Sequence, residues 1–512
     1  MVARAWFERA TPLAGAPGVV SLEVGAEAWT AAALDVAAAG GRLLTLWAEV
    51  GPQGGSTLRA AYAAEPGVMV VSVALLPAAR EYHGLHEVFP AATRMQRAVA
   101  DLSGLEARGG DRRPWLRHAA WATGFLPLLD RGEPDPPAAP VVDDYEFVRV
   151  TGDGVHEIAV GPVHAGIIEP GHFRFSVVGE KVLRLEERLG YVHKGIERRF
   201  AGLRLDAGHR LAARVSGDSA VAFSWAYCQA LEGMAGETVS SRAAWLRALA
   251  LELERLANHL GDLGALGNDA GFAFGLAQFS RLKELLLRQT ARVLGQRYLL
   301  DFVIPGGAVI DPEPASLAAL GEFTGLLSAE VGRLRQVYDE HAGLRDRFSG
   351  AGVVAPDLAR RLGLTGLAGR ASGQAFDLRV DLPCHPYDEL RPAKVTATEG
   401  DVGARVAVRF DEVAASCLLV RDIVDRLPDG PHRIELTCPA EGALGLGLIE
   451  GWRGPVLVAL SAGRDGAIRR CHPHDPSWHN WPVLEHAVVD NIVPDFPLIN
   501  KSFNLSYSGH DL

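Results

Sequence analysis

The chain has 512 residues, of which 48% are hydrophobic and 22% are charged, so it predicts a folded protein with more than one domain rather than a disordered one. A formal net charge of −11, with Lys and Arg spread without basic runs, argues against nucleic-acid binding. The five cysteines form no C-x-x-C pair, which argues against a disulfide framework and against a zinc or iron–sulfur motif in this chain.

No segment predicts a membrane span. The longest apolar runs, such as residues 68–78 (VMVVSVALLPA), are about half the length that a spanning helix needs and are rich in β-branched residues. The first residues contain no apolar core of the secretory kind. We therefore expect a cytoplasmic protein.

The first 130 residues predict a small α/β domain. Residues 41–50 (GRLLTLWAEV) and 67–76 (GVMVVSVALL) are typical of strands, and residues 91–105 (AATRMQRAVADLSGL) are typical of a helix. The Pro-rich run that follows, RGEPDPPAAPVVDD, cannot form a helix. We expect residues 131–144 to be a linker, and we expect limited proteolysis to cut between Pro136 and Asp144 before anywhere in the helical bundle.

Residues 145–512 predict a second domain in which long helices follow short strands and tight loops. Apolar residues at three- and four-residue spacing indicate helices over residues 182–200, 220–234, 241–263, 278–300, 315–341 and 401–426. Residues 433–459 alternate as strands. The predicted fold class is α+β, with a bundle of long helices and peripheral short strands.

Three segments carry residues that could do chemistry. The loop GPVHAGIIEPGH places His164, Glu169 and His172 close together, although a rigid structural loop explains the same pattern. His259 lies in LELERLANHL, where a histidine is more often a satisfied core residue. The histidines of RCHPHDPSWHNW have no standard zinc spacing.

Taken together, GPVHAGIIEPGH, YVHKGIERR, RVSGDS, LELERLANHL, GLTG with RASG, and the terminal DFP segment carry a family resemblance. From about Glu87 onward the chain resembles the large subunit of membrane-bound energy-converting nickel–iron hydrogenases and its relative, the quinone-chamber subunit of respiratory complex I, an NADH-quinone oxidoreductase. The stretch from His86 to His118 is similar to the end of the 30-kDa-type docking subunit of complex I. The resemblance implies a small N-terminal docking domain (1–130) fused to a hydrogenase-like large-subunit domain (145–512).

The nickel ligands of the hydrogenases are missing. The resemblance places Ser216, Ser219, Ser506 and Gly509 where the hydrogenases carry four cysteines. A neutral hydroxyl is a poor ligand for nickel, which needs soft, anionic sulfur. We therefore expect no bound metal and no hydrogen chemistry.

The resemblance also implies roles for other residues. Glu169 and Asp269 are candidates for proton transfer, since a partly buried carboxylate can be tuned towards neutral pH. Arg214 and His259 are expected to approach one another beside the iron–sulfur cluster of a partner. His164, Arg370 and Asp377 are expected to line the cavity, with Arg370 and Asp377 as a buried pair. The two complex I residues that contact quinone directly correspond to Ile168 and Gly217.

The resemblance implies no cofactor bound by this chain itself. It implies a small iron–sulfur partner, antiporter-like and other membrane-arm subunits, and a possible formate or NADH dehydrogenase module, with NAD(H) reached only through partners because the chain has no dinucleotide fingerprint. The expected place is the cytoplasmic face of the inner membrane, in an NADH:quinone oxidoreductase-type assembly that reduces quinone or another acceptor. The alternative is a non-catalytic scaffold that transmits conformational change.

Overall fold

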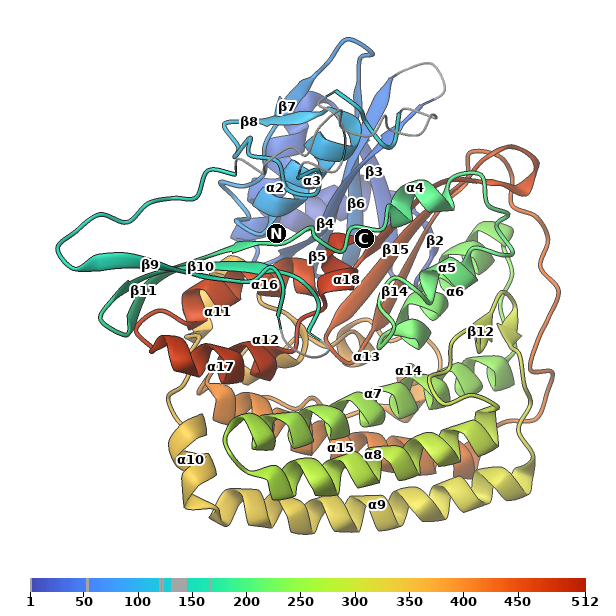
Figure 1. The fold of residues 1–512 in the computed structure, drawn as a ribbon. Coiled ribbons are helices and arrows are strands. Elements are labelled where there is room, and N and C mark those ends of the chain that lie inside the picture. The colour runs from blue at the N-terminus through green and yellow to red at the C-terminus, as the bar shows by residue number, and fades with distance from the viewer. Residues whose placement is uncertain (1, 52–54, 119–120, 122–123, 130–144, 165–167) are drawn as a thin grey trace.

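The structure is a computed structural model that describes residues 2–51, 55–118, 121, 124–129, 145–164 and 168–512. The N-terminal sheet and its helices lie at one end, the long helices lie at the other, and a second sheet with the C-terminal segments lies between them (Figure 1). This mixed arrangement confirms the α+β class. Among the described residues, every helix is too short or too polar to cross a membrane.

The N-terminal part is a five-stranded sheet in the order β1-β3-β6-β5-β4. Strands β4, β5 and β6 pair antiparallel, while β3 runs parallel to β6. The predicted strands over 41–50 and 67–76 and the predicted helix over 91–105 are confirmed as β4, β6 and α3. The elements of this part are α1 (Val2–Arg9), β1 (Thr11–Pro12), β3 (Val19–Val24), α2 (Ala26–Ala38), β4 (Arg42–Val50), β5 (Ser56–Ala64), β6 (Gly67–Leu75), β7 (Glu81–His83), α3 (Ala92–Ser103) and β8 (Glu106–Arg108).

The N-terminal part is joined to the rest of the molecule through a shared sheet. Strand β2 (Ala14–Gly15) pairs in parallel with β14 (Leu444–Glu450), next to β15 (Pro455–Ala462) and β16 (Ile468–His474). Across the same interface Thr45 Oγ1 lies 2.9 Å from His472 Nε2, and the Trp47 ring stacks on the His472 ring. One hydrophobic core runs through both parts. The predicted linker, 131–144, lies outside the described residues, so the division into two domains stays a prediction.

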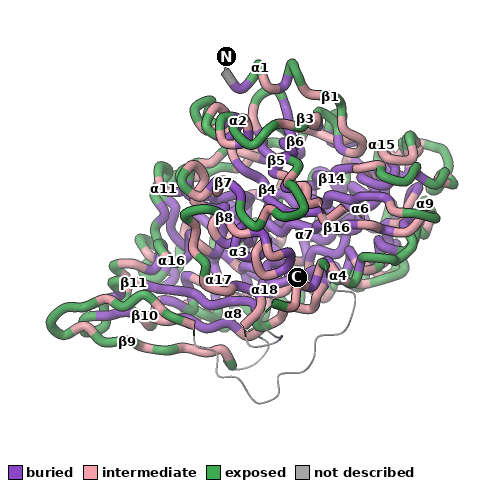
Figure 2. Tube along the Cα trace, turned by 90° about the horizontal axis from the view of Figure 1, so that it is seen from above, coloured by how far each residue is buried: buried purple, intermediate pink, exposed green. Residues whose placement is uncertain are grey.

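Four long helices form the other end of the described part of the molecule, and a fifth, α6, packs against β14 and β15 (Figure 1). Helix α7 is the central one: it packs against α8 and α15, and most of its residues are buried, whereas α9 lies at the edge (Figure 2). Polar caps set two of the starting points, because Ser240 Oγ accepts from Ala243 N and Asp401 Oδ1 accepts from Ala404 N. These helices confirm the predictions over 220–234, 241–263, 278–300, 315–341 and 401–426. They are α6 (Ala220–Ala235), α7 (Ser241–Asp269), α8 (Ala273–Leu294), α9 (Pro314–Glu340) and α15 (Val402–Arg426).

The helix predicted over residues 182–200 is wrong. Residues 181–188 form β11 (Lys181–Arg188), the edge of a three-stranded antiparallel sheet with β10 (His172–Val178) and β9 (Val155–Val160), and only α4 (Ile196–Phe200) is helical. Gly179 has a positive φ of 61°, which allows the tight turn between β10 and β11. The pattern of apolar residues did not predict strand β11 because charged residues occupy buried positions in it. One of them, Glu187, is buried in an ion pair with Arg94.

The strands predicted over 433–459 are confirmed only from residue 444 onward, as β14 and the first part of β15. Shorter elements connect the larger ones and carry the C-terminal end back against the N-terminal part (Figure 1). They are α5 (His209–Ala212), β12 (Val303–Ile304), β13 (Gly307–Ala308), α10 (Ala342–Phe348), α11 (Pro356–Leu362), α12 (Gly366–Ala371), α13 (Leu378–Asp381), α14 (Tyr387–Leu390), the 3-10 helices η1 (Arg464–Gly466) and η2 (Val493–Asp495), α16 (Ser477–Ala487), α17 (Phe496–Phe503) and α18 (Tyr507–Asp511).

Candidate functional site

Lys283 of α8 and Arg453 from the loop after β14 help to line a cavity of about 790 Å³, which lies where four further segments meet. They are the loop between β9 and β10, the turn before α6, the C-terminal half of α7, and the stretch from α17 to the start of α18. We call this cavity the chamber. Glu169, Asp269 and His164 line it, as do Gly217 and Ile168. These five positions, singled out from the sequence, are therefore brought together by the fold.

The turn before α6 and the start of α18 meet at the chamber wall and bring the four predicted nickel-ligand positions to one place. Ser216 Oγ and Ser506 Oγ are 2.8 Å apart, and Gly509 N donates to Ser506 Oγ at 2.9 Å. Ser216 Oγ also donates to Asp218 Oδ1 at 2.8 Å, and Ser219 is buried beside it. A chain of hydroxyl hydrogen bonds thus occupies these positions.

Asp475 fills the space beside Gly509. A Cβ atom on Gly509 would lie 2.5 Å from Asp475 Oδ2 and 2.9 Å from Ser506 Oγ, closer than real side chains approach. Asp475 is fully buried, its Oδ1 accepts from Ser477 N, and its Oδ2 has no hydrogen-bond partner among the described residues. Burial raises the pKa of Asp475. The volume that a thiolate side chain at position 509 would need is therefore already occupied.

Arg453 and Asp218 form an ion pair at the chamber wall. Two guanidinium nitrogens of Arg453 lie 2.5 Å and 2.7 Å from the Asp218 carboxylate, and Arg453 Nε donates to the Asn504 carbonyl. Burial disfavours the charged carboxylate of Asp218, yet the Arg453 charge and the hydrogen bonds from Arg453 and Ser216 hold its pKa below the usual range. The sequence reasoning missed both residues. The available signal was an arginine in GWRGP, between a buried tryptophan and two turn residues.

Glu169 and His164 are held by the backbone and by α18. Glu169 Oε1 accepts from Ser508 Oγ at 3.0 Å, and Glu169 Oε2 accepts from Ser508 N at 3.3 Å. The His164 ring is 2.8 Å from the Gly171 carbonyl. Lys194 Nζ donates to the Ser508 carbonyl, and burial lowers the pKa of Lys194. A carboxylate and an ammonium group therefore approach the same turn of the chain.

Asp269 borders the chamber from the C-terminal end of α7. Its side chain is exposed at this rim, and partial desolvation there raises its pKa. Lys283 and Lys501 line the same cavity. The chamber rim thus carries charges of both signs.

Arg214 and His259 belong to different networks. His259 is fully buried, with its Nε2 atom 2.8 Å from Glu412 Oε2, and burial lowers its pKa. Arg214 points to the surface, where two of its nitrogens bond Asp301 at 2.6 Å and 2.8 Å. No hydrogen bond or ion pair joins these two described side chains. The expected approach of Arg214 to His259 is therefore not seen.

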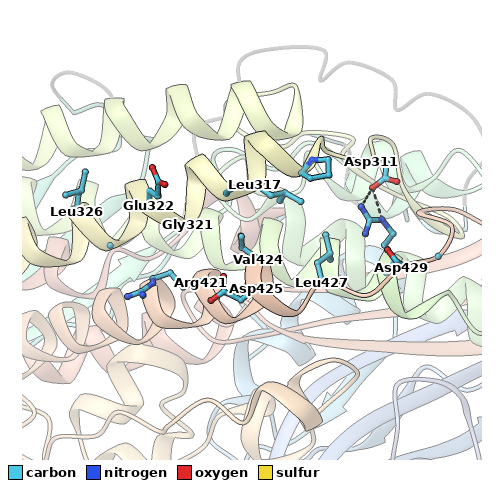
Figure 3. Close-up of a pocket in the computed structure, with 15 residues that line it drawn as sticks. Asp311, Leu317, Gly321, Glu322, Leu326, Arg421, Val424, Asp425, Leu427 and Asp429 are labelled. Atoms are coloured by element: carbon cyan, nitrogen blue, oxygen red, sulfur yellow. Dashed lines mark hydrogen bonds and ion pairs between the residues drawn. The ribbon is translucent and has the colours of Figure 1, made fainter.

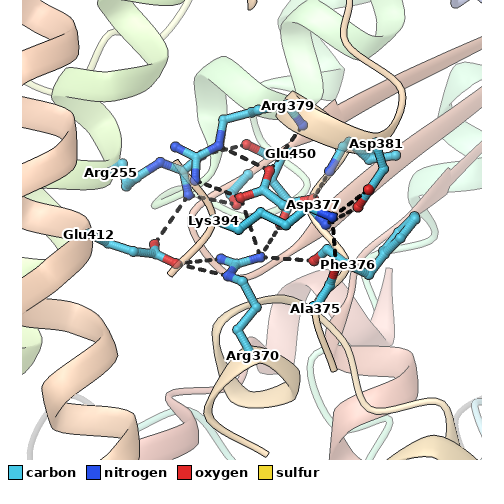
Figure 4. Close-up of polar contacts among 12 residues, drawn as sticks. Arg255, Arg370, Ala375, Phe376, Asp377, Arg379, Asp381, Lys394, Glu412 and Glu450 are labelled. Atoms are coloured by element: carbon cyan, nitrogen blue, oxygen red, sulfur yellow. Dashed lines mark hydrogen bonds and ion pairs between the residues drawn. The ribbon is translucent and has the colours of Figure 1, made fainter. Parts of the chain in front are cut away.

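Arg370 and Asp377 form the predicted buried pair, at 3.8 Å, but they do not line the chamber. They lie in a closed network in which Arg370 bonds Glu412 at 2.6 Å and Glu450 at 2.8 Å (Figure 4). Arg379 pairs with Asp377 at 2.8 Å and extends the network to Glu252. Such a network holds α12, α13, α15 and β14 together, so the expectation that Arg370 and Asp377 line the cavity is corrected.

Two further features lie apart from the chamber. An open groove of about 1040 Å³ runs between α9 and α15 and ends at the Arg242–Asp311 ion pair (Figure 3). His385, Asp388 and Glu389 are the one group of His, Cys, Asp and Glu side chains, within the described ranges, close enough together to hold a metal ion. None of the three lines the chamber.

Comparison with known proteins relates the chain to respiratory-chain and hydrogenase proteins. Residues 269–444 match the family described as the 49-kDa subunit of the respiratory-chain NADH dehydrogenase. Formate hydrogenlyase subunit 5 of Escherichia coli (strain K12) is 32% identical over 439 residues, which cover 84% of this chain and 77% of that protein. The C/D fusion protein of the NADH-quinone oxidoreductase of Bacteroides fragilis (strain ATCC 25285) is 29% identical over 335 residues, 65% of this chain and 61% of that protein.

A solved structure shares the fold. A chain of the membrane-bound sulfane sulfur reductase, an archaeal respiratory membrane complex, superposes with a TM-score of 0.66 at 24% identity and covers 71% of this chain and 100% of that chain. The relatives are thus subunits of hydrogenases and of complex I-type oxidoreductases. The chain belongs to the family of hydrogenase large subunits and complex I 49-kDa subunits.

Proposed function

We propose that this chain forms the electron-acceptor chamber of a membrane-associated, complex I-like oxidoreductase and that it does not work as a nickel hydrogenase. One observation carries the proposal. Two of the four positions that hold nickel in the hydrogenases, Ser216 and Ser506, line the chamber of about 790 Å³ as a hydrogen-bonded hydroxyl pair, while ionisable side chains border the same space. A chamber of this size is within the range of small-molecule sites.

In this proposal a small partner subunit supplies electrons from its iron–sulfur cluster, and an acceptor such as a quinone takes two electrons and two protons in the chamber. The residues of this chain bind and orient the acceptor and deliver the protons. Glu169 is the candidate for the last proton donor, because its carboxylate borders the chamber and is held there by hydrogen bonds from Ser508. Asp269 is the candidate for proton exchange at the rim.

The relatives support membrane-arm subunits, and either an NADH or a formate module, as partners in the same complex. This chain would then sit on the cytoplasmic face of the membrane, and NAD(H) would reach the complex only through another subunit. His259 and Arg214 could still tune a partner's cluster separately, His259 through Glu412 and Arg214 from the surface.

The alternative is a non-catalytic scaffold. The extensive buried network around Arg370 favours it, since such a network could transmit a rearrangement from the helices to the sheet without redox chemistry. The two functions differ in the role of Glu169. Its carboxylate delivers a proton to the acceptor in the first function and takes no part in a reaction in the second.

The Glu169→Gln variant separates them. The assembled complex is purified with wild-type chain, with Glu169→Gln, and with Glu180→Gln as a control, because Glu180 is exposed in the turn between β10 and β11 and does not line the chamber. We expect electron transfer to the acceptor to fall on the order of 100-fold in Glu169→Gln alone. Full activity of an assembled Glu169→Gln complex would favour the scaffold.

A further inference from the structure

A buried carboxylate that the chamber does not include lies on α7. Glu254 is 8% exposed, and its Oε2 atom accepts a hydrogen bond from Val221 N at 2.8 Å, in the first turn of α6. Its Oε1 atom lies 3.4 Å from Ala222 N. No arginine or lysine forms an ion pair with Glu254 among the pairs found in the described residues. The carboxyl group is therefore held by backbone groups alone.

Glu254 borders a second cavity, of about 140 Å³, between α7 and α8. This volume has room for a few water molecules, each of which takes about 30 Å³ in the liquid. Gly217, Asp218, Asn258 and Lys283 line both this cavity and the chamber. At the other end the second cavity reaches Tyr298, which is 55% exposed. Glu254 thus lies between solvent and the chamber.

The charged groups around Glu254 come from three elements. Arg255, its neighbour on α7, turns away to the carbonyl groups of Glu450 and Gly451. Lys283 of α8 and Arg297 after α8 line the cavity, and Arg297 is paired with Glu284. Asp218, from the turn before α6, is paired with Arg453.

These surroundings make the neutral acid the favoured form near neutral pH. Burial raises the pKa of Glu254 to about 8, and the Asp218 charge acts in the same direction. The backbone hydrogen bonds and Arg255 oppose this shift without cancelling it. A carboxyl group that holds its proton at pH 7 can both give and regain one.

We propose that Glu254 is a proton carrier on a water path. The path runs from the protein surface at Tyr298 through the second cavity to the chamber. The step moves one proton and no electrons. The Glu254 carboxyl gives its proton to a water of the second cavity, the proton passes along the Asp218 side of the shared wall into the chamber, and a proton from solvent restores the acid. This inference rests on the proposed function, because the chamber reaction consumes the protons.

Two variants test the path in the assembled complex. Glu254→Gln removes the proton but keeps an oxygen for Val221 N. Ala257→Leu fills the second cavity and replaces no carboxylate, and Ala257 does not line the chamber. We expect each to lower acceptor reduction on the order of tenfold or more, and the fall of the wild-type rate above pH 8 to disappear in Glu254→Gln. Glu322→Gln on exposed α9 and Ala257→Ser serve as controls. Unchanged rates and an unchanged pH profile in an active complex would overturn the proposal.

An infrared measurement on the full chain gives a readout independent of turnover. The wild-type chain should show a protonated-carboxyl band at pH 7 that exchanges in D₂O, titrates near pH 8 and is absent in Glu254→Gln. A wild-type chain without such a band would overturn the role of Glu254. By contrast, a wild-type complex with the band that passes no electrons to any acceptor would overturn the proposed function.

Discussion

Asp475 decides what can stand at position 509. Because a Cβ atom on Gly509 would lie 2.5 Å from Asp475 Oδ2, Gly509→Ala should lower the free energy of unfolding by about 1–3 kcal/mol. Urea unfolding of the full chain measures this loss. In an Asp475→Ala background the same substitution should cost much less, and an equal loss in both backgrounds would contradict the explanation.

The contact between Asp475 and position 509 also affects whether the chain can bind nickel. Elemental analysis of the protein, expressed in a host that matures nickel enzymes, should find no stoichiometric nickel and no hydrogen turnover, because hydroxyls replace the thiolates. Restoring cysteine at positions 216, 219, 506 and 509 should still give no nickel centre, since Asp475 occupies the side-chain volume at position 509. Stoichiometric nickel with hydrogen turnover in the wild-type protein would refute this assignment.

Glu197 makes stability depend on pH. Burial alone would raise its pKa, but Arg470 at 2.8 Å and His472 at 2.6 Å outweigh burial and hold the pKa at about 2, against an ordinary value of 4.5. A depressed carboxyl pKa stabilises the fold above pH 4.5, and this contribution is lost as the pH falls from 4.5 towards 2. It amounts to about 3 kcal/mol.

Glu197→Gln should therefore be less stable than wild type at pH 7, and the difference should narrow at pH 3. Denaturant unfolding at both pH values measures this. A difference that stays constant with pH would mean that the Glu197 charge is not the cause.

At the residue scale, the sequence motifs predicted site positions that lie within a single motif, such as Glu169, Ser216 and Ser506. They missed Asp475, Arg453 and Glu254, because the roles of these residues come from neighbours distant in the sequence: Asp475 meets Gly509, Arg453 meets Asp218, and Glu254 meets the start of α6. Arg370 was expected at the chamber because the family resemblance of the GLTG and RASG segments implies a residue that lines the cavity. The fold instead buries it among three carboxylates.

At the element scale, the long helices were predictable because each has an apolar face and a defined start. Asp401 caps α15 through Ala404 N at 2.7 Å and also accepts from Gly350 N at 2.8 Å. Asp401→Ala should lower the free energy of unfolding by about 1–2 kcal/mol, measured by thermal or urea unfolding. Asp401→Asn, which keeps an accepting oxygen, should lose less, and equal losses would show that capping is not involved.

Strand β11 could not be predicted in the same way. Its buried positions include Glu186, Glu187 and Arg188. Glu187 pairs with Arg94 of α3, Glu186 pairs with Arg113 of the loop after β8, and Arg188 donates to the Trp115 carbonyl of the same loop. A pattern of apolar residues cannot reveal such partners, so the spacing of Val182, Leu185 and Leu189 imitated a helix. The turn at Gly179 was the one local signal for a hairpin.

At the scale of the whole molecule, the N-terminal part and the helical part share one interface. Besides the β2–β14 pairing, Glu49 of β4 lies 2.6 Å from Arg469 and accepts from Ser461 Oγ at 3.0 Å. Limited proteolysis should cut first within 131–144, yet the two fragments should elute together in gel filtration because the interface remains. Separate elution without denaturant would contradict this prediction, and a first cut within α7 would contradict the predicted linker.

The pairing of β2 with β14 also bears on stoichiometry. A docking strand on a separate polypeptide would bind its partner sheet only as far as its concentration allowed, whereas a strand on the same chain meets β14 at an effective concentration that dilution does not change. The ribosome also makes β2 long before β14, so the open edge of the C-terminal sheet finds its partner already present. Each C-terminal sheet is then made with one copy of the N-terminal part, whatever the level of expression.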